Sequence, residues 1–114
     1  MKLITSIIRE TKLDEVREEL INNNIQGLTV TRVSGHGKQI TEEYYRGKKI
    51  VPDLIPKVKL EILIQDEKVD KVVDMIIKKA RTNTKGEIGD GKIWILSIDD
   101  CIKIRTGERG NDAI

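Results

Sequence analysis

The chain has 114 residues, of which 38% are hydrophobic, 35% are charged and 3% are aromatic, with no phenylalanine. Lys and Arg (21) nearly balance Asp and Glu (19), so the net charge is +2 and no basic footprint marks a nucleic-acid surface. These values predict one compact domain with a modest core and exclude an aromatic platform for stacking bases.

No segment approaches the roughly 20 apolar residues of a membrane span, and no signal peptide is recognised, so a cytoplasmic protein is expected. A single cysteine, Cys101, excludes an internal disulfide and is interpreted as a buried thiol in a reducing compartment. His36 is the only histidine, so one chain cannot assemble a metal site from histidines.

The first half of the chain predicts two strands joined by a helix, followed by a long loop. Residues 3–8 form the first strand, and Thr11 is interpreted as the cap of a helix that ends at the asparagines 22–24. Residues 28–33, rich in Val and Thr, predict the second strand. Residues 34–56 contain three glycines, two prolines and no apolar period, which is typical of a functional loop.

The second half repeats the same order. Apolar residues alternate over 58–64, which predicts a half-buried third strand, and Asp66 is interpreted as a helix cap. Residues 69–80 carry apolar side chains at helical spacing and give the clearest helical pattern in the chain. A fourth strand is expected over 93–96 and a short fifth strand over 101–105, followed by a polar tail.

Two successive β-α-β units in about a hundred residues predict an α+β fold, the ferredoxin-like βαββαβ sandwich with a short extra C-terminal strand. Such a sheet has helices on one face only. Leu3, Ile64 and Trp94 supply apolar side chains for both faces, so we expect an oligomer that buries the second face.

Three segments beside strand ends have the composition of phosphate sites. They are the glycine-rich turn 35–39, the loop 86–92, and the cations Lys103 and Arg105, which a strand would project from one face. The loop 86–92 has the spacing G-x-x-x-x-G-K. Ile93 stands where a P-loop carries the Ser or Thr that holds Mg²⁺, and a strand follows instead of a helix, so this is not a P-loop.

No pair of nucleophile and general base stands out, so no catalytic residue is predicted. Asp90 lies between glycines, which favours a role in the turn over a catalytic or metal-binding one, and His36 has no evident acid partner. A small phosphotransferase or phosphatase on the same fold stays open as the alternative to a binding protein. A nucleic-acid module is disfavoured by the charge balance.

Five motifs in order resemble the PII nitrogen-regulatory signal proteins, and the resemblance covers essentially the whole chain. The motifs are Gly35-x-Gly37-Lys38-Gln39, Tyr45-Arg46-Gly47, Pro56-Lys57-Val58-Lys59, Ile88-Gly89-Asp90-Gly91-Lys92-Ile93 and Ile104-Arg105-Thr106-Gly107-Glu108.

The resemblance implies a regulator and not an enzyme: a homotrimer of single PII-like domains (1–114) in which ATP and ADP compete in clefts between subunits. It implies that 2-oxoglutarate binds together with Mg-ATP. A T-loop at about 36–55 would dock on nitrogen-assimilation targets such as an ammonium transporter or glutamine synthetase, with membrane contact only through a transporter. A B-loop at about 82–92 and a C-terminal region at about 101–114 would complete the cleft.

The resemblance also assigns residues. For nucleotide it implies Ile7, Thr29, Gly35, Gly37, Lys38, Gln39, Leu63, Gly89, Asp90, Gly91, Lys92, Lys103 and Arg105. In this set Ile7, Leu63 and a neighbour's Thr29 would frame the adenine, and Lys103 and Arg105 would come from an adjacent chain. For 2-oxoglutarate it implies Gly37, Gln39, Ile40, Thr41 and Lys57. For Mg²⁺ it implies the amide oxygen of Gln39.

The chain departs from the family pattern at several positions. Ile50 stands where many members carry a modifiable tyrosine, and Lys48 stands where some members carry a serine that is phosphorylated. Lys103 replaces a customary arginine, and the two are not equivalent as phosphate clamps. The T-loop is about one residue short after Gln39, and the B-loop is a few residues longer around residues 83–85.

Overall fold

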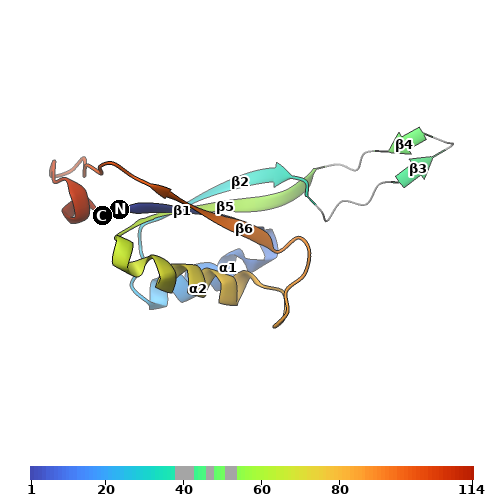
Figure 1. The fold of residues 1–114 in the computed structure, drawn as a ribbon, viewed down its shortest axis with the longest axis horizontal. Helices are drawn as coiled ribbons and strands as arrows, with labels where there is room; N and C mark the ends of the chain where they lie inside the picture. The colour runs from blue at the N-terminus through green and yellow to red at the C-terminus, as the bar shows by residue number, and fades with distance from the viewer. Residues whose placement is uncertain (38–42, 46–47, 51–53) are drawn as a thin grey trace.

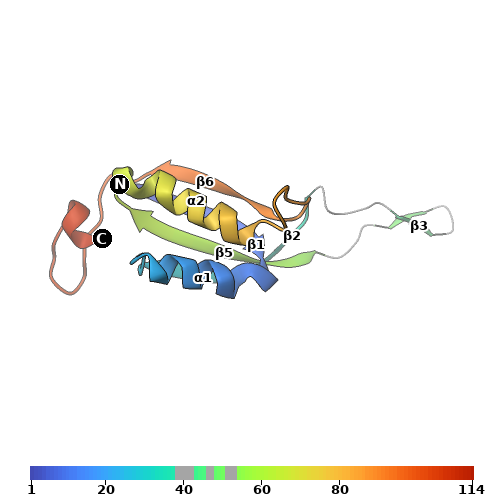
Figure 2. The same cartoon turned by 90° about the horizontal axis from the view of Figure 1, so that it is seen from below.

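The computed structural model describes residues 1–37, 43–45, 48–50 and 54–114. Within these residues, one antiparallel sheet has the strand order β2-β5-β1-β6. Its strands are β1 (Lys2–Arg9), β2 (Leu28–Gly35), β5 (Ile55–Ile64) and β6 (Gly91–Ser97). The helices α1 (Leu13–Asn22) and α2 (Val69–Ala80) cover one face of it (Figures 1 and 2). The predicted ferredoxin-like βαββαβ fold is confirmed.

The core lies between this sheet and the two helices. Side chains alternate across a strand, so every second residue of β1 and β5 points at the helices. Ile4 and Ile8 of β1 are almost completely buried there, as is Leu60 of β5. Each such side chain contributes roughly 1.5–3 kcal/mol by leaving water. The full buried set is Ile4, Ile8, Val16, Leu20, Ile25, Val58, Leu60, Ile62, Ile64, Val69, Val72, Met75, Ile76 and Ala80.

Both predicted helix caps are wrong. Thr11 lies within a 3₁₀ turn, Glu10–Lys12, that leads into α1, and Asp66 begins a similar turn, Asp66–Lys68, before α2. Neither α-helix has a side-chain hydrogen bond at its N-cap. The carboxylate of Asp66 instead pairs with the α-amine of Met1 at 2.9 Å, which lowers the pKa of Asp66.

The expected loop over 34–56 contains regular structure. Strand β3 (Glu43–Tyr45) pairs antiparallel with β4 (Lys48–Ile50), and both lie beyond the ends of β2 and β5 (Figure 1). Strand β5 also begins earlier than predicted and includes Pro56. Pairing of β1 with β5 stops at Lys57, so Pro56 has only β2 as a neighbour and its missing N–H is tolerated.

The fifth strand expected over 101–105 does not form. Only an isolated bridge joins Ile102 to Arg109, and a turn lies between them. The carboxylate of Asp100 closes this turn by accepting hydrogen bonds from Arg109, from Cys101 N (2.8 Å) and from Gly110 N (3.2 Å). The bond from Arg109 is the main cause of the lowered pKa of Asp100.

Ser6 gives a test of how the sheet is packed. Its hydroxyl is fully buried on the helix side of β1 and has no hydrogen-bond partner within the described residues. Replacing Ser6 by Ala removes an unpaired polar group, so the free energy of unfolding should stay unchanged or rise by up to about 1 kcal/mol. Ile4→Ala, on the same face of β1, is the matched control and should cost about 2–5 kcal/mol. Urea unfolding measures both, and a clear loss of stability in Ser6→Ala would contradict the expectation.

Candidate functional site

A cleft of about 780 Å³ opens on the face of the sheet that the helices leave uncovered. It is formed where the end of β1, the end of β2 and the start of β5 meet the loop that leads into β6. Its lining is Ile7, Val33, Ser34, Gly35, His36, Gly37, Ile55, Lys57, Glu87, Ile88, Gly89, Asp90, Gly91, Lys92 and Trp94. Residues 35–37 of one predicted phosphate segment and residues 87–92 of another therefore line the same cleft.

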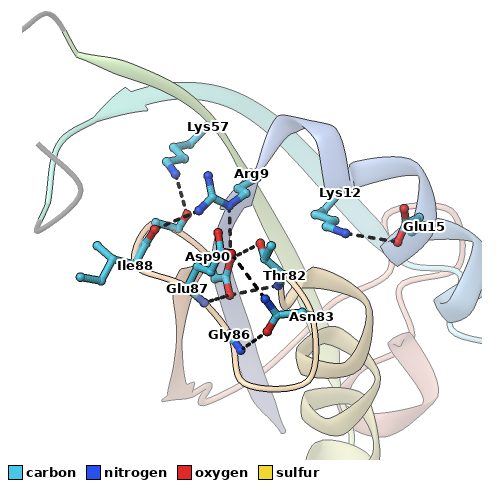
Figure 3. Close-up of polar contacts among 11 residues, drawn as sticks. Arg9, Lys12, Glu15, Lys57, Thr82, Asn83, Gly86, Glu87, Ile88 and Asp90 are labelled. Carbon is cyan, nitrogen blue, oxygen red and sulfur yellow. Dashed lines mark hydrogen bonds and ion pairs between the residues drawn. The ribbon is translucent and has the colours of Figure 1, made fainter.

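The carboxylate of Asp90 organises the loop before β6 (Figure 3). One oxygen, Oδ2, accepts hydrogen bonds from the backbone N–H groups of Glu87 (2.8 Å) and Thr82 (3.1 Å). The other, Oδ1, accepts from the Thr82 hydroxyl (2.5 Å) and from Nε of Arg9 (3.2 Å). The carboxylate thus joins the residues after α2, the middle of the loop and the end of β1.

These bonds determine the charge of Asp90. Partial burial by itself would raise the pKa of this carboxyl group, but the hydrogen bonds from Thr82, Glu87 and Arg9 favour the ionised form more strongly. The pKa of Asp90 is consequently held far below its usual range. The carboxylate remains charged throughout the neutral range.

Two cations hold the carbonyl groups of the same loop. Arg9 donates from its terminal nitrogen to the oxygen of Ile88 (2.9 Å), and Lys57 donates to the oxygen of Gly89 (2.7 Å), as Figure 3 shows. Arg9 and Lys57 face each other across β1 and β5. Burial lowers the pKa of Lys57, the charge of Arg9 lowers it further, and Asp90 opposes the change.

Two backbone N–H groups of this loop are free to meet an anion. Within the described residues, the N–H groups of Ile88 and Gly89 have no hydrogen-bond partner, while the carbonyls of both residues are bound by cations. Successive N–H groups of a glycine-rich turn make an anion-binding concavity. Lys92, which also lines the cleft, adds a positive charge beside it.

Glycine is required at position 91 by geometry. Gly91 has φ +109°, and a β-carbon there would lie 1.7 Å from the carbonyl oxygen of Ile7. The loop can therefore lie against β1 only without a side chain at this position. Earlier in the same loop, Asn83 has φ 61° and accepts hydrogen bonds at its side-chain oxygen from the N–H groups of Lys85 and Gly86.

The cleft brings together only part of the predicted site. Eight of the predicted residues line it, namely Ile7, Gly35, Gly37, Lys57, Gly89, Asp90, Gly91 and Lys92. Thr29, Leu63, Lys103 and Arg105 do not line it. Lys38, Gln39, Ile40 and Thr41, which include the predicted Mg²⁺ ligand, lie outside the described residues.

The strand register corrects one expected pair. Ile7 is opposite Lys59, whereas Leu63 is opposite Leu3, four positions further along the sheet. At about 3.3 Å per residue this separates the two side chains by roughly 13 Å. One chain therefore cannot bring Ile7 and Leu63 to the same base. Thr29 pairs with Glu61, beside Leu63, so Thr29 and Leu63 form a separate patch at the far end of the same face.

The third predicted cluster is a turn and not a strand face. The carbonyl of Lys103 accepts a hydrogen bond from Gly107 N at 2.7 Å, and Lys103 N donates to the oxygen of Glu108 at 2.9 Å. The Lys103 ammonium lies 3.9 Å from the Glu108 carboxylate. Ile104, at the tip, is fully exposed.

Sequence reasoning missed Arg9 and Thr82 as members of the site. Arg9 lies two residues after Ile7, so strand alternation alone would have placed its side chain on the face of the cleft. Thr82 gave no comparable indication, because its hydroxyl meets Asp90 only through the folding of the loop.

Within the part of the chain that the structure describes, no three His, Cys, Asp or Glu side chains gather in a way that could hold a metal ion. No helix there has the length and apolar character to cross a bilayer.

The fold and the cleft define a class: a ferredoxin-like domain with a cleft between the end of β2, the start of β5 and the loop before β6. The family described as "Nitrogen regulatory protein P-II" matches residues 1–108. The chain is 49% identical to the Nitrogen regulatory protein P-II of Rhodospirillum rubrum over the full length of both. It is also 49% identical to the Nitrogen regulatory protein P-II 2 of Methanothermobacter thermautotrophicus, covering all of this chain and 97% of the relative.

The chain belongs to the P-II family of nitrogen regulatory proteins. It is a signal-transduction regulator, and its family consists of effector-binding proteins that are not enzymes. The alternative of a phosphotransferase or phosphatase is set aside on this ground. The carboxylate of Asp90, its one candidate catalytic group, is moreover occupied by the loop.

Gly91→Ala should destabilise the protein by at least about 2 kcal/mol, because the new β-carbon combines a left-handed φ with a clash against backbone. Gly35→Ala is the control, since a β-carbon there meets nothing within 4 Å, and it should cost less than about 1 kcal/mol. Thermal or urea unfolding compares the two. Equal stabilities would show that the loop does not lie against β1 as described.

Asp90→Asn should lower the free energy of unfolding by about 1–3 kcal/mol at neutral pH, because charged hydrogen bonds are lost. The folded-state pKa of Asp90 is below its unfolded value of about 3.9, so this stabilisation is complete above that pH and is lost as the pH falls. The gap between wild type and variant should therefore narrow by about 1 kcal/mol near pH 3. A gap that stays constant from pH 7 to pH 3 in urea unfolding would refute the assignment.

Proposed function

We propose that this protein senses adenine nucleotides and 2-oxoglutarate in the cytoplasm and passes the signal on through the segment between β2 and β5. ATP and ADP compete for the cleft, and 2-oxoglutarate binds there only together with Mg-ATP. The observation that supports this most directly is the pair of unpartnered N–H groups at Ile88 and Gly89, with Lys92 beside them. They offer donors and positive charge to phosphate oxygens.

The complete binding site would require a second subunit. Lys103, Arg105, Thr29 and Leu63 lie away from the cleft of their own chain, and a neighbouring copy in a homotrimer could supply them. The uncovered face of the sheet also carries exposed apolar side chains, Trp94 and Leu96, for which a subunit interface would provide burial. Thr29 and Leu63 are close together in the sheet, so both would arrive from the same neighbour.

Mg²⁺ and 2-oxoglutarate would bind where the segment between β2 and β5 leaves β2. Gln39 would hold Mg²⁺ through its amide oxygen, and Gly37, Ile40 and Thr41 would supply backbone N–H groups. Lys57 would pair with a carboxylate of 2-oxoglutarate. The ammonium group of Lys57 lines the cleft, and its bond to the Gly89 carbonyl holds it beside the loop.

Ligand binding would control which conformation the segment at about 36–55 adopts, and that conformation would decide docking on a target. A ligand shifts such an equilibrium only by binding one conformation more tightly than another. The cleft meets the segment at His36, Gly37 and Ile55, so a bound ligand can contact both of its ends. An ammonium transporter or glutamine synthetase would be a fitting target, with the membrane reached only through the transporter.

Calorimetric titration tests the proposal. The wild type should bind ATP and ADP, and should bind 2-oxoglutarate only when Mg-ATP is present. Lys57→Met should weaken 2-oxoglutarate by at least about tenfold, because a charge-assisted bond is lost. Gln39→Ala should abolish 2-oxoglutarate binding and leave ADP binding largely intact.

Lys59→Met provides the matched control. Lys59 lies on the same face of β5, two residues from Lys57, but it does not line the cleft. This variant should bind 2-oxoglutarate as the wild type does. A wild type that binds no ATP at millimolar nucleotide ends the proposal.

A further inference from the structure

We infer that Asp90, Thr82 and Arg9 act together as positioning residues for the phosphate-binding backbone, and that Asp90 itself touches neither phosphate nor metal. The inference rests on the proposed binding of nucleotide in this cleft. It replaces the expectation that Asp90 is a direct nucleotide ligand.

The carboxylate of Asp90 is saturated with hydrogen bonds. A carboxylate has about four acceptor directions, two on each oxygen. The Thr82 N–H and the Glu87 N–H use those of Oδ2, while the Thr82 hydroxyl and Arg9 Nε use those of Oδ1. No lone pair is left to coordinate a cation, and a fixed negative charge would repel phosphate. The carboxylate therefore faces its own loop.

The direction of the Gly89 amide is set by the carbonyl of the same peptide group. A trans peptide is planar, so the N–H of Gly89 points opposite to the carbonyl of Ile88. Arg9 holds that carbonyl at 2.9 Å and at the same time donates to Asp90. The ion pair of Arg9 and Asp90 consequently fixes the orientation of a peptide whose N–H has no partner within the described residues.

Thr82 connects the end of α2 to the Asp90 carboxylate. It follows the end of α2 and does not line the cleft, yet it gives both its N–H and its hydroxyl to Asp90. Through these bonds the end of the helix limits where the loop can lie. At the other end of the loop, Gly91 is held against the backbone of Ile7. The N–H groups of Ile88 and Gly89 lie between these two fixed points.

Thr82→Val and Thr82→Ser form a matched pair for the test. Neither substitution changes a charge, and position 82 does not line the cleft. Valine removes the hydroxyl that binds Asp90, whereas serine keeps it. We expect Thr82→Val to weaken ATP and ADP by about tenfold, since one charge-assisted bond is lost, and Thr82→Ser to match the wild type within about twofold. Adenosine, which has no phosphate, should bind all three proteins equally.

Asp90→Asn tests whether ATP affinity rises or falls when the charge of Asp90 is removed. If Asp90 acted only through its charge, removing that charge would strengthen the binding of anionic ATP. A positioning role predicts weaker ATP binding with unchanged adenosine binding. Calorimetry for the nucleotides and NMR titration for adenosine supply the affinities, and unchanged adenosine binding shows that the variant is folded at the cleft.

The outcomes separate the two hypotheses. Wild type that binds no ATP overturns the nucleotide cleft and, with it, this inference. Wild type that binds ATP, together with a Thr82→Val protein of equal ATP affinity or an Asp90→Asn protein of higher ATP affinity, overturns only the positioning role. Equal losses for ATP and adenosine in Thr82→Val would assign Thr82 to general stability and would also overturn the inference.

Discussion

The ion pair between Arg9 and Asp90 connects the central strand β1 to the loop that forms the cleft. Arg9 ends a strand whose other residues are fixed by neighbours on both sides, so it is a rigid anchor. Through its bond to Arg9, Asp90 restrains the loop before β6, which has no strand pairing of its own. Both side chains are only partly exposed, at 24% and 18%, which makes the pair less screened than a surface salt bridge.

The two faces of the sheet divide the tasks of the molecule. The helix-covered face holds nearly all of the buried apolar side chains and stabilises the fold. The uncovered face carries charged and apolar residues together, with Lys57, Arg9 and Lys92 at one end and Leu3 and Leu63 at the other. A face of this kind is poorly suited to water over its whole length, which agrees with the subunit interface that we propose for it.

The cleft uses cations in an indirect way. Lys57 and Arg9 lie beside a loop proposed to bind phosphate, yet in this structure both bind carbonyl oxygens of that loop. Their positive charge therefore offsets the carbonyl dipoles and leaves N–H groups as the exposed donors. The glycine at 91 permits the loop to lie directly against β1, since a side chain there would meet the Ile7 carbonyl.

The sequence by itself determined the architecture and the family. Period-2 and period-3.6 apolar patterns follow from which side chains must leave water, so residues 58–64 and 69–80 predicted β5 and α2 closely. The glycine spacing around Gly89 and Gly91 also predicted an anion-binding loop, and that assignment stays a prediction. Only the tertiary structure decided the caps, the C-terminal turn and the grouping of the site. Asp66 binds the Met1 amine, Asp100 closes a turn where alternation predicted a strand, and the register separates Leu63 from Ile7. Each of these depends on contacts between residues far apart in the chain, and local patterns carry no information about such partners.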